Sequence, residues 1–227
     1  MKQFGLFAKA WTPGKVKTRL AQTIGDQAAA SIYQTFVETI VARLSGIADQ
    51  TVIAYSPADQ QPLFQQLPVD TWNLQPQGEG DLGQRLEHYF SSAFKAGAKQ
   101  VVLIGTDSPD LPVDYVNKAF ALLAQTDVVI GPSDDGGYYL VGMSQFRPDI
   151  FADIPWSTET VFDATLQRLD EHQIPFRELP MWYDVDTQQD LIRLCIKLRS
   201  DDSPEPWSVQ LLQQIETILQ TQRPANR

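Results

Sequence analysis

Short apolar runs alternate along this chain with longer segments in which apolar residues recur at helical spacing. This alternation predicts βαβ units, in which a helix crosses between parallel strands and covers one face of their sheet. The run 101–104 is purely aliphatic, which indicates a strand buried on both faces at the sheet centre. We therefore expect an α/β protein with a largely parallel sheet covered on both faces.

The same pattern predicts the individual elements. Strands are expected at 4–8, 51–55, 71–74, 101–104, 127–130 and 138–143, and helices at 26–44, 81–96, 113–123, 159–169 and 188–198. The segment 9–25 is unusually long for a connection. After a polar break at 200–206, an amphipathic segment follows that could pack back on the domain or form a homodimer contact. The simplest organisation is one domain over 1–227, with 200–227 as a C-terminal helical extension.

The composition limits the classes of binding partner that we expect. The 227 residues carry 18 Lys and Arg against 28 Asp and Glu, a net charge of −10, so a nucleic acid or an anionic membrane is not expected as the main partner. Small molecules are expected instead. Cys195 is the single cysteine, which excludes an internal disulfide and a cysteine metal cage. With no apolar run approaching about 20 residues, we expect a cytoplasmic protein.

A basic loop follows the first expected strand. Four cations lie within the eleven residues 9–19, namely Lys9, Lys15, Lys17 and Arg19, and Gly14 would let the backbone approach a phosphate closely. Open α/β sheets bind ligands at this end of their strands. The loop therefore predicts a phosphate-binding site, although a solvated run of charges is the alternative.

Acidic residues follow two other expected strands or extended segments. Asp107 and Asp110 come directly after the central strand, and Asp184 and Asp186 precede the helix at 188. Carboxylates at such positions suit Mg²⁺ or Mn²⁺, so Asp107, Asp186 and Asp184 are candidate metal ligands. The alternative is that these acids, or Thr187, only cap the helices that follow them.

A pair of glycines has a candidate role in substrate binding. Asp134 and Asp135 precede Gly136, Gly137 and Tyr138, where the backbone could lie against a sugar and either acid could act as base towards an acceptor. A plain β-turn that happens to carry two acidic residues would explain the glycines equally well.

Two further segments could complete the site. Gly80 and Asp81 lead into the helix at 81–96 and could close over the base or ribose of a nucleotide, or Asp81 could cap that helix. Trp156 could contact an acceptor, but packing explains it as well. His88 and His172 lie within expected helices, and no Gly-x-Ser-x-Gly motif is present, so serine hydrolase chemistry is not expected.

Four segments in this order resemble a bacterial glycosyltransferase family known as transferase 1 of selenodomain- or arsenosugar-associated clusters, within the GT-A nucleotide-diphospho-sugar transferase superfamily. The resemblance covers roughly residues 3–195 and is carried by Pro13-Gly14-Lys15-Val16-Lys17-Thr18-Arg19-Leu20, Gly105-Thr106-Asp107-Ser108-Pro109, Asp134-Asp135-Gly136-Gly137-Tyr138-Tyr139-Leu140 and Asp184-Val185-Asp186-Thr187. More distantly, the chain is similar to phospholactate guanylyltransferase and to molybdenum-cofactor nucleotidyltransferases.

This resemblance implies a three-layer α/β/α sandwich with a mostly parallel mixed sheet. It also implies that Lys15, Lys17 and Arg19 bind the phosphates of a nucleotide and that Asp107 is the metal acid. The second acid of the Asp-x-Asp motif usual in GT-A enzymes is replaced by Pro109. Asp107 would then act alone or with a remote acid.

Two reactions and one binding role are compatible with these residues. In glycosyl transfer, an acceptor hydroxyl attacks the sugar of a nucleotide-diphosphate sugar, with Asp134 or Asp135 as candidate base. In nucleotidyl transfer, an acceptor phosphate attacks a nucleoside triphosphate, pyrophosphate leaves, and no base is needed. A nucleotide-binding module without catalysis is the third possibility. Only the family resemblance favours glycosyl transfer.

Overall fold

The computed structural model describes residues 1–68 and 70–221, and its centre is a seven-stranded sheet. The strands lie in the order β3-β2-β1-β4-β6-β5-β7, and β6 runs antiparallel to both neighbours, β4 and β5, whereas the other pairs are parallel. Their bounds are β1 (Lys2–Lys9), β2 (Gln50–Ser56), β3 (Trp72–Pro76), β4 (Gln100–Ile104), β5 (Val128–Pro132), β6 (Tyr138–Met143) and β7 (Phe176–Glu178).

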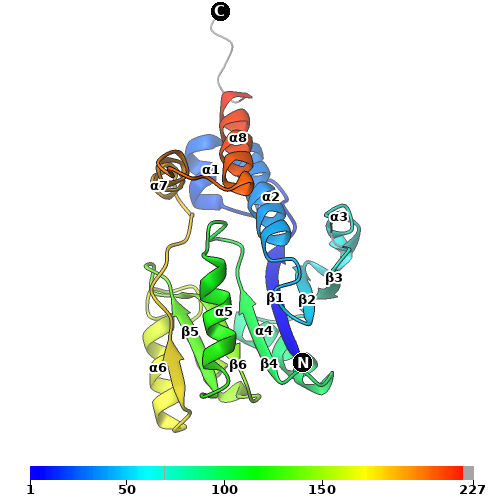
Figure 1. The fold of residues 1–227 in the computed structure, drawn as a ribbon, viewed down its shortest axis with the longest axis vertical. Helices are drawn as coiled ribbons and strands as arrows, with labels where there is room; N and C mark the ends of the chain where they lie inside the picture. The colour runs from blue at the N-terminus through cyan, green and yellow to red at the C-terminus, as the bar shows by residue number, and fades with distance from the viewer. Residues whose placement is uncertain (69, 222–227) are drawn as a thin grey trace, which may run out of the picture.

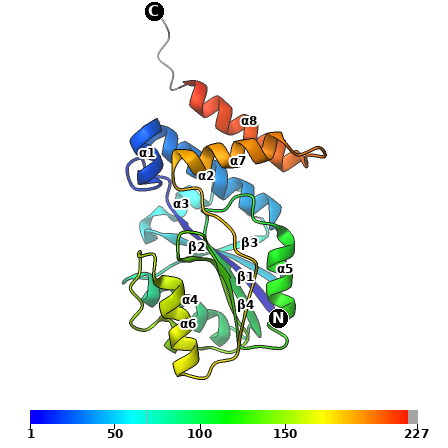
Figure 2. The same ribbon diagram turned by 90° about the vertical axis from the view of Figure 1, so that its left-hand side faces the viewer.

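Helices cover both faces of this sheet (Figures 1 and 2). Helices α4 and α6 lie on one face and α2 and α5 on the other, while α1, α7 and α8 gather around α2 beyond the end of β1. The helix bounds are α1 (Thr18–Ile24), α2 (Asp26–Arg43), α3 (Gln61–Phe64), α4 (Leu82–Lys95), α5 (Val113–Leu122), α6 (Val161–Glu171), α7 (Gln188–Arg199) and α8 (Pro206–Thr221). The expected α/β/α sandwich with a mixed sheet is thus confirmed.

The two sides of the sheet follow from the alternation of side chains along each strand. On β1, Phe4 and Leu6 pack into the cluster shared with α2 and α5, whereas Phe7 faces the cluster shared with α4 and α6. On β2, Ile53 joins the first cluster and Val52 the second. All residues of β4 from Val101 onward are buried, as its aliphatic composition predicts.

Several short elements were not expected from the sequence. Helix α1 lies within the long segment 9–25, and β7 is a three-residue strand at the sheet edge. Two 3-10 helices, at Ala58–Gln60 and Pro148–Phe151, and the four-residue α3 were also missed. Each is too short to show a hydrophobic period. Conversely, the extended segment expected to end in Asp184 and Asp186 is irregular backbone at both residues.

The C-terminal amphipathic segment forms α8, and its fully buried side chains Leu211 and Ile215 pack in the cluster around α2 and α7. It therefore packs back on the fold, and the expected homodimer contact stays a prediction. The end of the expected extension, residues 222–227, lies outside the described residues. None of the described helices combines the length and the apolar composition that crossing a membrane requires.

Candidate functional site

A cavity of about 590 Å³ opens at the carboxyl ends of β1 and β4 and beside the start of the antiparallel strand β6. Parallel strands of open α/β sheets bind ligands at this edge. The lining includes six residues that the sequence predicted to contact a nucleotide, namely Lys9, Lys15, Lys17, Arg19, Gly80 and Asp81, together with Asp107, Asp186 and Tyr138.

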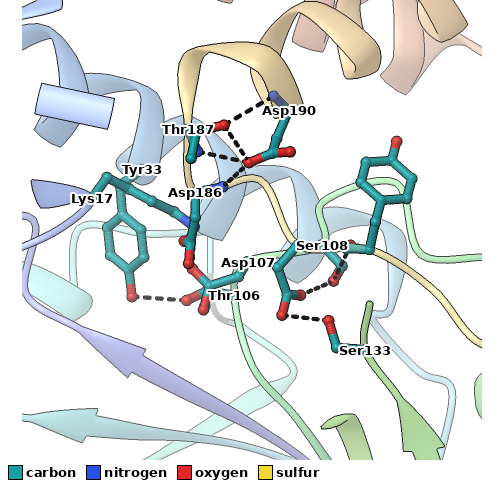
Figure 3. A network of polar contacts seen from close by, with 11 residues as sticks. Lys17, Tyr33, Thr106, Asp107, Ser108, Ser133, Asp186, Thr187 and Asp190 are labelled. Atoms are coloured by element: carbon teal, nitrogen blue, oxygen red, sulfur yellow. Dashed lines mark hydrogen bonds and ion pairs between the residues drawn. The ribbon is translucent and has the colours of Figure 1, made fainter. Parts of the chain in front are cut away.

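Lys17 lies between two of the predicted acids (Figure 3). Its ammonium donates to Asp107 and, over 2.9 Å, to Asp186 Oδ1. The Lys17 side chain is only 2% exposed, whereas those of Asp107 and Asp186 are 45% and 37% exposed. A buried cation therefore holds together two carboxylates that face the cavity.

Backbone contacts explain how Asp186, far along the chain, reaches Asp107. The Val185 N–H donates to the Asp107 carbonyl oxygen over 2.8 Å, which ties the segment before α7 to the loop after β4. Thr187 then caps α7, with Asp190 completing the capping box, as the sequence predicted. Asp186 is not the cap, and α5 begins after Pro112 without any side-chain cap from the described residues. Capping therefore explains neither Asp107 nor Asp186.

Asp184 has a different environment from Asp186. Its Oδ1 accepts from Ser108 Oγ over 2.7 Å and its Oδ2 from Ser133 Oγ over 2.8 Å. Burial and the negative charge of Asp107 raise the pKa of the Asp184 carboxyl above its usual value, and the two serine hydrogen bonds oppose this shift. The structure thus turns Asp184 to two serines and does not bring it to Lys17.

Charge and burial also shift the neighbouring groups. Burial alone would lower the pKa of Lys17, but the carboxylates of Asp107 and Asp186 raise it above its usual value, so this ammonium stays charged. Burial and Asp107 raise the pKa of Tyr33 to about 12. The Tyr33 hydroxyl accepts from the Lys9 N–H and the Thr106 hydroxyl, which joins α2 to the ends of β1 and β4.

Unlike Lys17, the other cationic side chains that line the cavity have no carboxylate partner among the described residues. Within residues 1–68 and 70–221, Lys9, Lys15, Arg19 and Arg85 take part in no ion pair. Lys9, Lys15 and Arg19 are exposed at the cavity rim. In a chain of net charge −10, this gathering leaves positive charge available for an anionic ligand.

Several predicted site residues are not among those lining the cavity. Asp134 pairs with Arg193 over 3.0 Å, and Asp135 Oδ1 accepts from the Gly137 N–H over 2.9 Å, as in a turn. Gly136 packs against the backbone at Glu159. Neither Gly14 nor Trp156 lines the cavity, and Trp156 packs against Tyr138 and Phe151.

Sequence reasoning gave no role to several polar residues that line the cavity, Gln77 and Arg85 among them. Gln77 follows the edge strand β3, and its buried side chain bonds to the backbone of β1 and β2. Arg85 lies in the first turns of α4, which Asp81 caps as expected. The position of Gln77 just before the glycine-rich segment 78–83 was the available signal.

Comparison with known proteins gives the family. A family model described as an uncharacterized protein conserved in bacteria (DUF2064) matches residues 41–158, which is more than half of the chain. The chain belongs to this family. A candidate nucleotide-diphospho-sugar transferase from Desulfovibrio desulfuricans G20 is 33% identical and similar over 97% of each chain, with a TM-score of 0.86.

More distant structures share the fold of this DUF2064 member. A cytidylyltransferase from Leptospira borgpetersenii is 15% identical over 99% of each chain, with a TM-score of 0.57. Rv0371c from Mycobacterium tuberculosis H37Rv, in complex with manganese, is 16% identical over 85% of this chain and 97% of that one, with a TM-score of 0.51. Such identities show the fold alone. No curated protein sequence matches the chain significantly.

Proposed function

We propose that this protein is a transferase that uses a nucleotide donor, and that it transfers the sugar of a nucleotide-diphosphate sugar to a small acceptor. The observation that carries this proposal is the buried Lys17 ammonium between Asp107 and Asp186, beside the exposed cations of the cavity rim. The resemblance over 97% of the chain to a candidate nucleotide-diphospho-sugar transferase supports the choice of donor.

The cations act on the departing diphosphate. As the acceptor oxygen bonds to the anomeric carbon, the bond between this carbon and the diphosphate oxygen breaks, the acceptor gives up its proton to a base, and the nucleoside diphosphate leaves. Lys15, Lys17 and Arg19 stabilise the negative charge that develops on the leaving group. Because Lys17 is already fixed by two carboxylates, its ammonium needs little reorganisation in the transition state.

Asp107 and Asp186 also fit a divalent cation. Both carboxylates contact one ammonium and keep partly exposed oxygens towards the cavity. The described residues contain no cluster of three His, Cys, Asp or Glu side chains that could hold a metal. Mg²⁺ and Mn²⁺ often take one or two carboxylates, with phosphate and water oxygens completing the shell. When bound, such an ion would neutralise charge on the diphosphate. A solved structure of similar fold, Rv0371c, is a complex with manganese, which supports the choice of a divalent cation.

Nucleotidyl transfer is the second candidate function, and one observation favours it. Asp134 and Asp135, the acids expected to act as base towards an acceptor hydroxyl, are not among the residues that line the cavity. An acceptor phosphate is already ionised and needs no base. In this reaction the acceptor attacks the α-phosphorus, and pyrophosphate leaves towards Lys15, Lys17 and Arg19.

A thermal-shift panel followed by product analysis tests the proposal. The ligands are UDP-, GDP-, ADP- and TDP-sugars and nucleoside triphosphates, each with Mg²⁺, Mn²⁺ or EDTA. A ligand at 100 times its Kd adds about 2.7 kcal/mol of stability. We expect one nucleotide sugar to stabilise the protein and, with acceptors supplied, to release its nucleoside diphosphate. Pyrophosphate release from a triphosphate would favour nucleotidyl transfer, and no response to any nucleotide would refute both.

Two matched variants test whether the stabilisation by nucleotide and metal depends on Asp107. Asp107→Asn should remove the metal-dependent part of the stabilisation, because it takes away one of the two carboxylates that would hold the divalent cation. Asp134→Asn is the control, because Asp134 pairs with Arg193 on the surface. If both variants bind the nucleotide as the parent does, Asp107 has no role in the site.

A further inference from the structure

We infer that Gln77 selects the base of the bound nucleotide, by accepting a hydrogen bond from a base N–H with its side-chain oxygen. The inference rests on the nucleotide site proposed above and assigns a specificity residue within it. The basic loop and the acids Asp107 and Asp186 supply no base-recognising group, since the proposed function assigns them to phosphates and metal.

The side chain of Gln77 is held by the sheet. Its Nε2 donates to the carbonyl oxygens of Ala8, over 3.2 Å, and Ala54, over 2.9 Å, at the carboxyl ends of β1 and β2. Its backbone N–H donates to the Tyr55 carbonyl oxygen over 2.9 Å. The residue is 4% exposed, so its side chain has little freedom to rotate.

This arrangement fixes which end of the amide faces the ligand. A carbonyl oxygen only accepts, so the two carbonyl partners require the NH₂ group on their side. Oε1 must then point away from Ala8 and Ala54. No hydrogen-bond donor of the described residues reaches Oε1. The protein does not enclose this atom completely, because it is absent from the set of fully buried side-chain atoms without a partner. Gln77 lines the cavity, and our inference assigns its Oε1, which has no partner among these residues, as the acceptor that meets the ligand there.

The surroundings of Gln77 suit a flat aromatic base. Phe7, Leu86 and Leu103 line the cavity and belong to the apolar cluster on the α4 side of the sheet. Lys17 lies on the opposite side, against Phe36 of α2. The cavity thus has an apolar part with one fixed acceptor and a charged part, as a site for a nucleoside with its phosphates requires.

A fixed acceptor discriminates between bases. A base that turns an N–H towards Oε1 satisfies it, whereas one that turns a carbonyl oxygen or a bare ring nitrogen there leaves two acceptors facing each other. Sites with a buried polar group reject analogues that cannot pair with it more strongly than apolar pockets reject a change of shape.

Calorimetric titration with paired nucleoside diphosphates tests the assignment, because both candidate donors contain this moiety. In each pair the analogue lacks one donor group of the base. The amino group is absent in the pairs GDP with IDP, ADP with purine riboside diphosphate, and CDP with pyrimidin-2-one riboside diphosphate, and a methyl group replaces the ring N–H hydrogen in the pairs GDP with 1-methyl-GDP and UDP with 3-methyl-UDP. For the preferred base, we expect the parent protein to bind the analogue about tenfold more weakly. In Gln77→Met, the ratio of the analogue's Kd to that of the unmodified nucleoside diphosphate should fall to about one.

Two further variants keep the result interpretable. Gln75→Met is the matched control on the preceding strand, because Gln75 does not line the cavity, and it should keep the parental ratio. Gln77→Lys retains donors for Ala8 and Ala54 but has no acceptor, so it should also lose the ratio if Gln77→Met does not fold. A ratio that persists in the Gln77 variants, or no difference within any pair, would overturn the inference alone. Absence of binding by every diphosphate would overturn the nucleotide site as well.

Discussion

At the scale of single residues, the Lys17 ammonium supplies the positive charge that lets Asp107 and Asp186 lie together. Lys17→Met keeps the apolar stem but leaves two carboxylates without their counter-charge. We expect the free energy of unfolding to fall by about 1–2 kcal/mol, less than for a fully buried pair because water still reaches both acids. Urea unfolding at neutral pH measures this change.

The control for this substitution is Lys118→Met, which removes an exposed lysine of α5. It should leave the unfolding free energy within about 0.5 kcal/mol of the parent. Equal stability of Lys17→Met and the parent would mean that the ammonium does not hold the two acids together.

Asp184 gives a pH dependence of stability with a defined sign. Its pKa is higher in the folded than in the unfolded chain, because burial and Asp107 disfavour the charged carboxylate. Above the unfolded pKa the folded protein therefore binds more protons, and stability falls as the pH rises towards the folded pKa. The fall is at most about 1.4 kcal/mol per pH unit.

Asp184→Asn should remove this component, since an amide does not titrate in this range. We expect the variant to gain stability relative to the parent at pH 8, and the gain to shrink at pH 4. Unfolding titrations at several pH values check this. A difference between variant and parent that does not change with pH would contradict the raised pKa.

At the scale of elements, the turn before β6 shows how the backbone near the site is fixed. Gly136 has φ 87°, and a Cβ there would lie 2.0 Å from the Glu159 carbonyl oxygen. Gly136→Ala should therefore destabilise the fold by about 3 kcal/mol, through both backbone strain and the clash with the loop before α6.

Gly46→Ala separates these two causes. Gly46 has φ 74°, but a Cβ added there would meet no described atom within 4 Å, so only the strain of about 1 kcal/mol remains. Thermal and urea unfolding of both variants give the comparison. Similar losses at the two glycines would show that the Glu159 contact adjusts without cost.

At the scale of the whole molecule, a basic cavity lies in a protein of net charge −10. Anion binding there should weaken with salt, because raising NaCl from about 0.1 M to about 1 M shortens the Debye length from about 10 Å to about 3 Å. We expect the nucleotide affinity of the parent protein to fall several-fold over this range. Arg19→Met should make the affinity less dependent on salt, whereas Lys118→Met should leave the salt dependence unchanged. Titrations at several salt concentrations decide, and an affinity independent of salt would argue against phosphate binding by these cations.

The sequence determined the fold class and the basic loop that follows β1. Alternating apolar runs specify strands that must be covered by helices, and four cations within eleven residues mark a place for negative charge. The helix caps at Asp81 and Thr187 were predictable as well, since a cap depends on neighbours three residues apart. These features are local, so a pattern along the chain contains them.

Only the tertiary structure decided which polar residues meet. Asp186 reaches Lys17 and Asp107, whereas Asp184, two residues earlier, turns to Ser108 and Ser133. Gln77 joins the cavity because β3 pairs beside β2, which brings its amide to the carbonyls of β1 and β2. Such contacts join residues far apart along the chain, and their geometry depends on strand order and on the path of irregular segments, which hydrophobic periodicity does not specify.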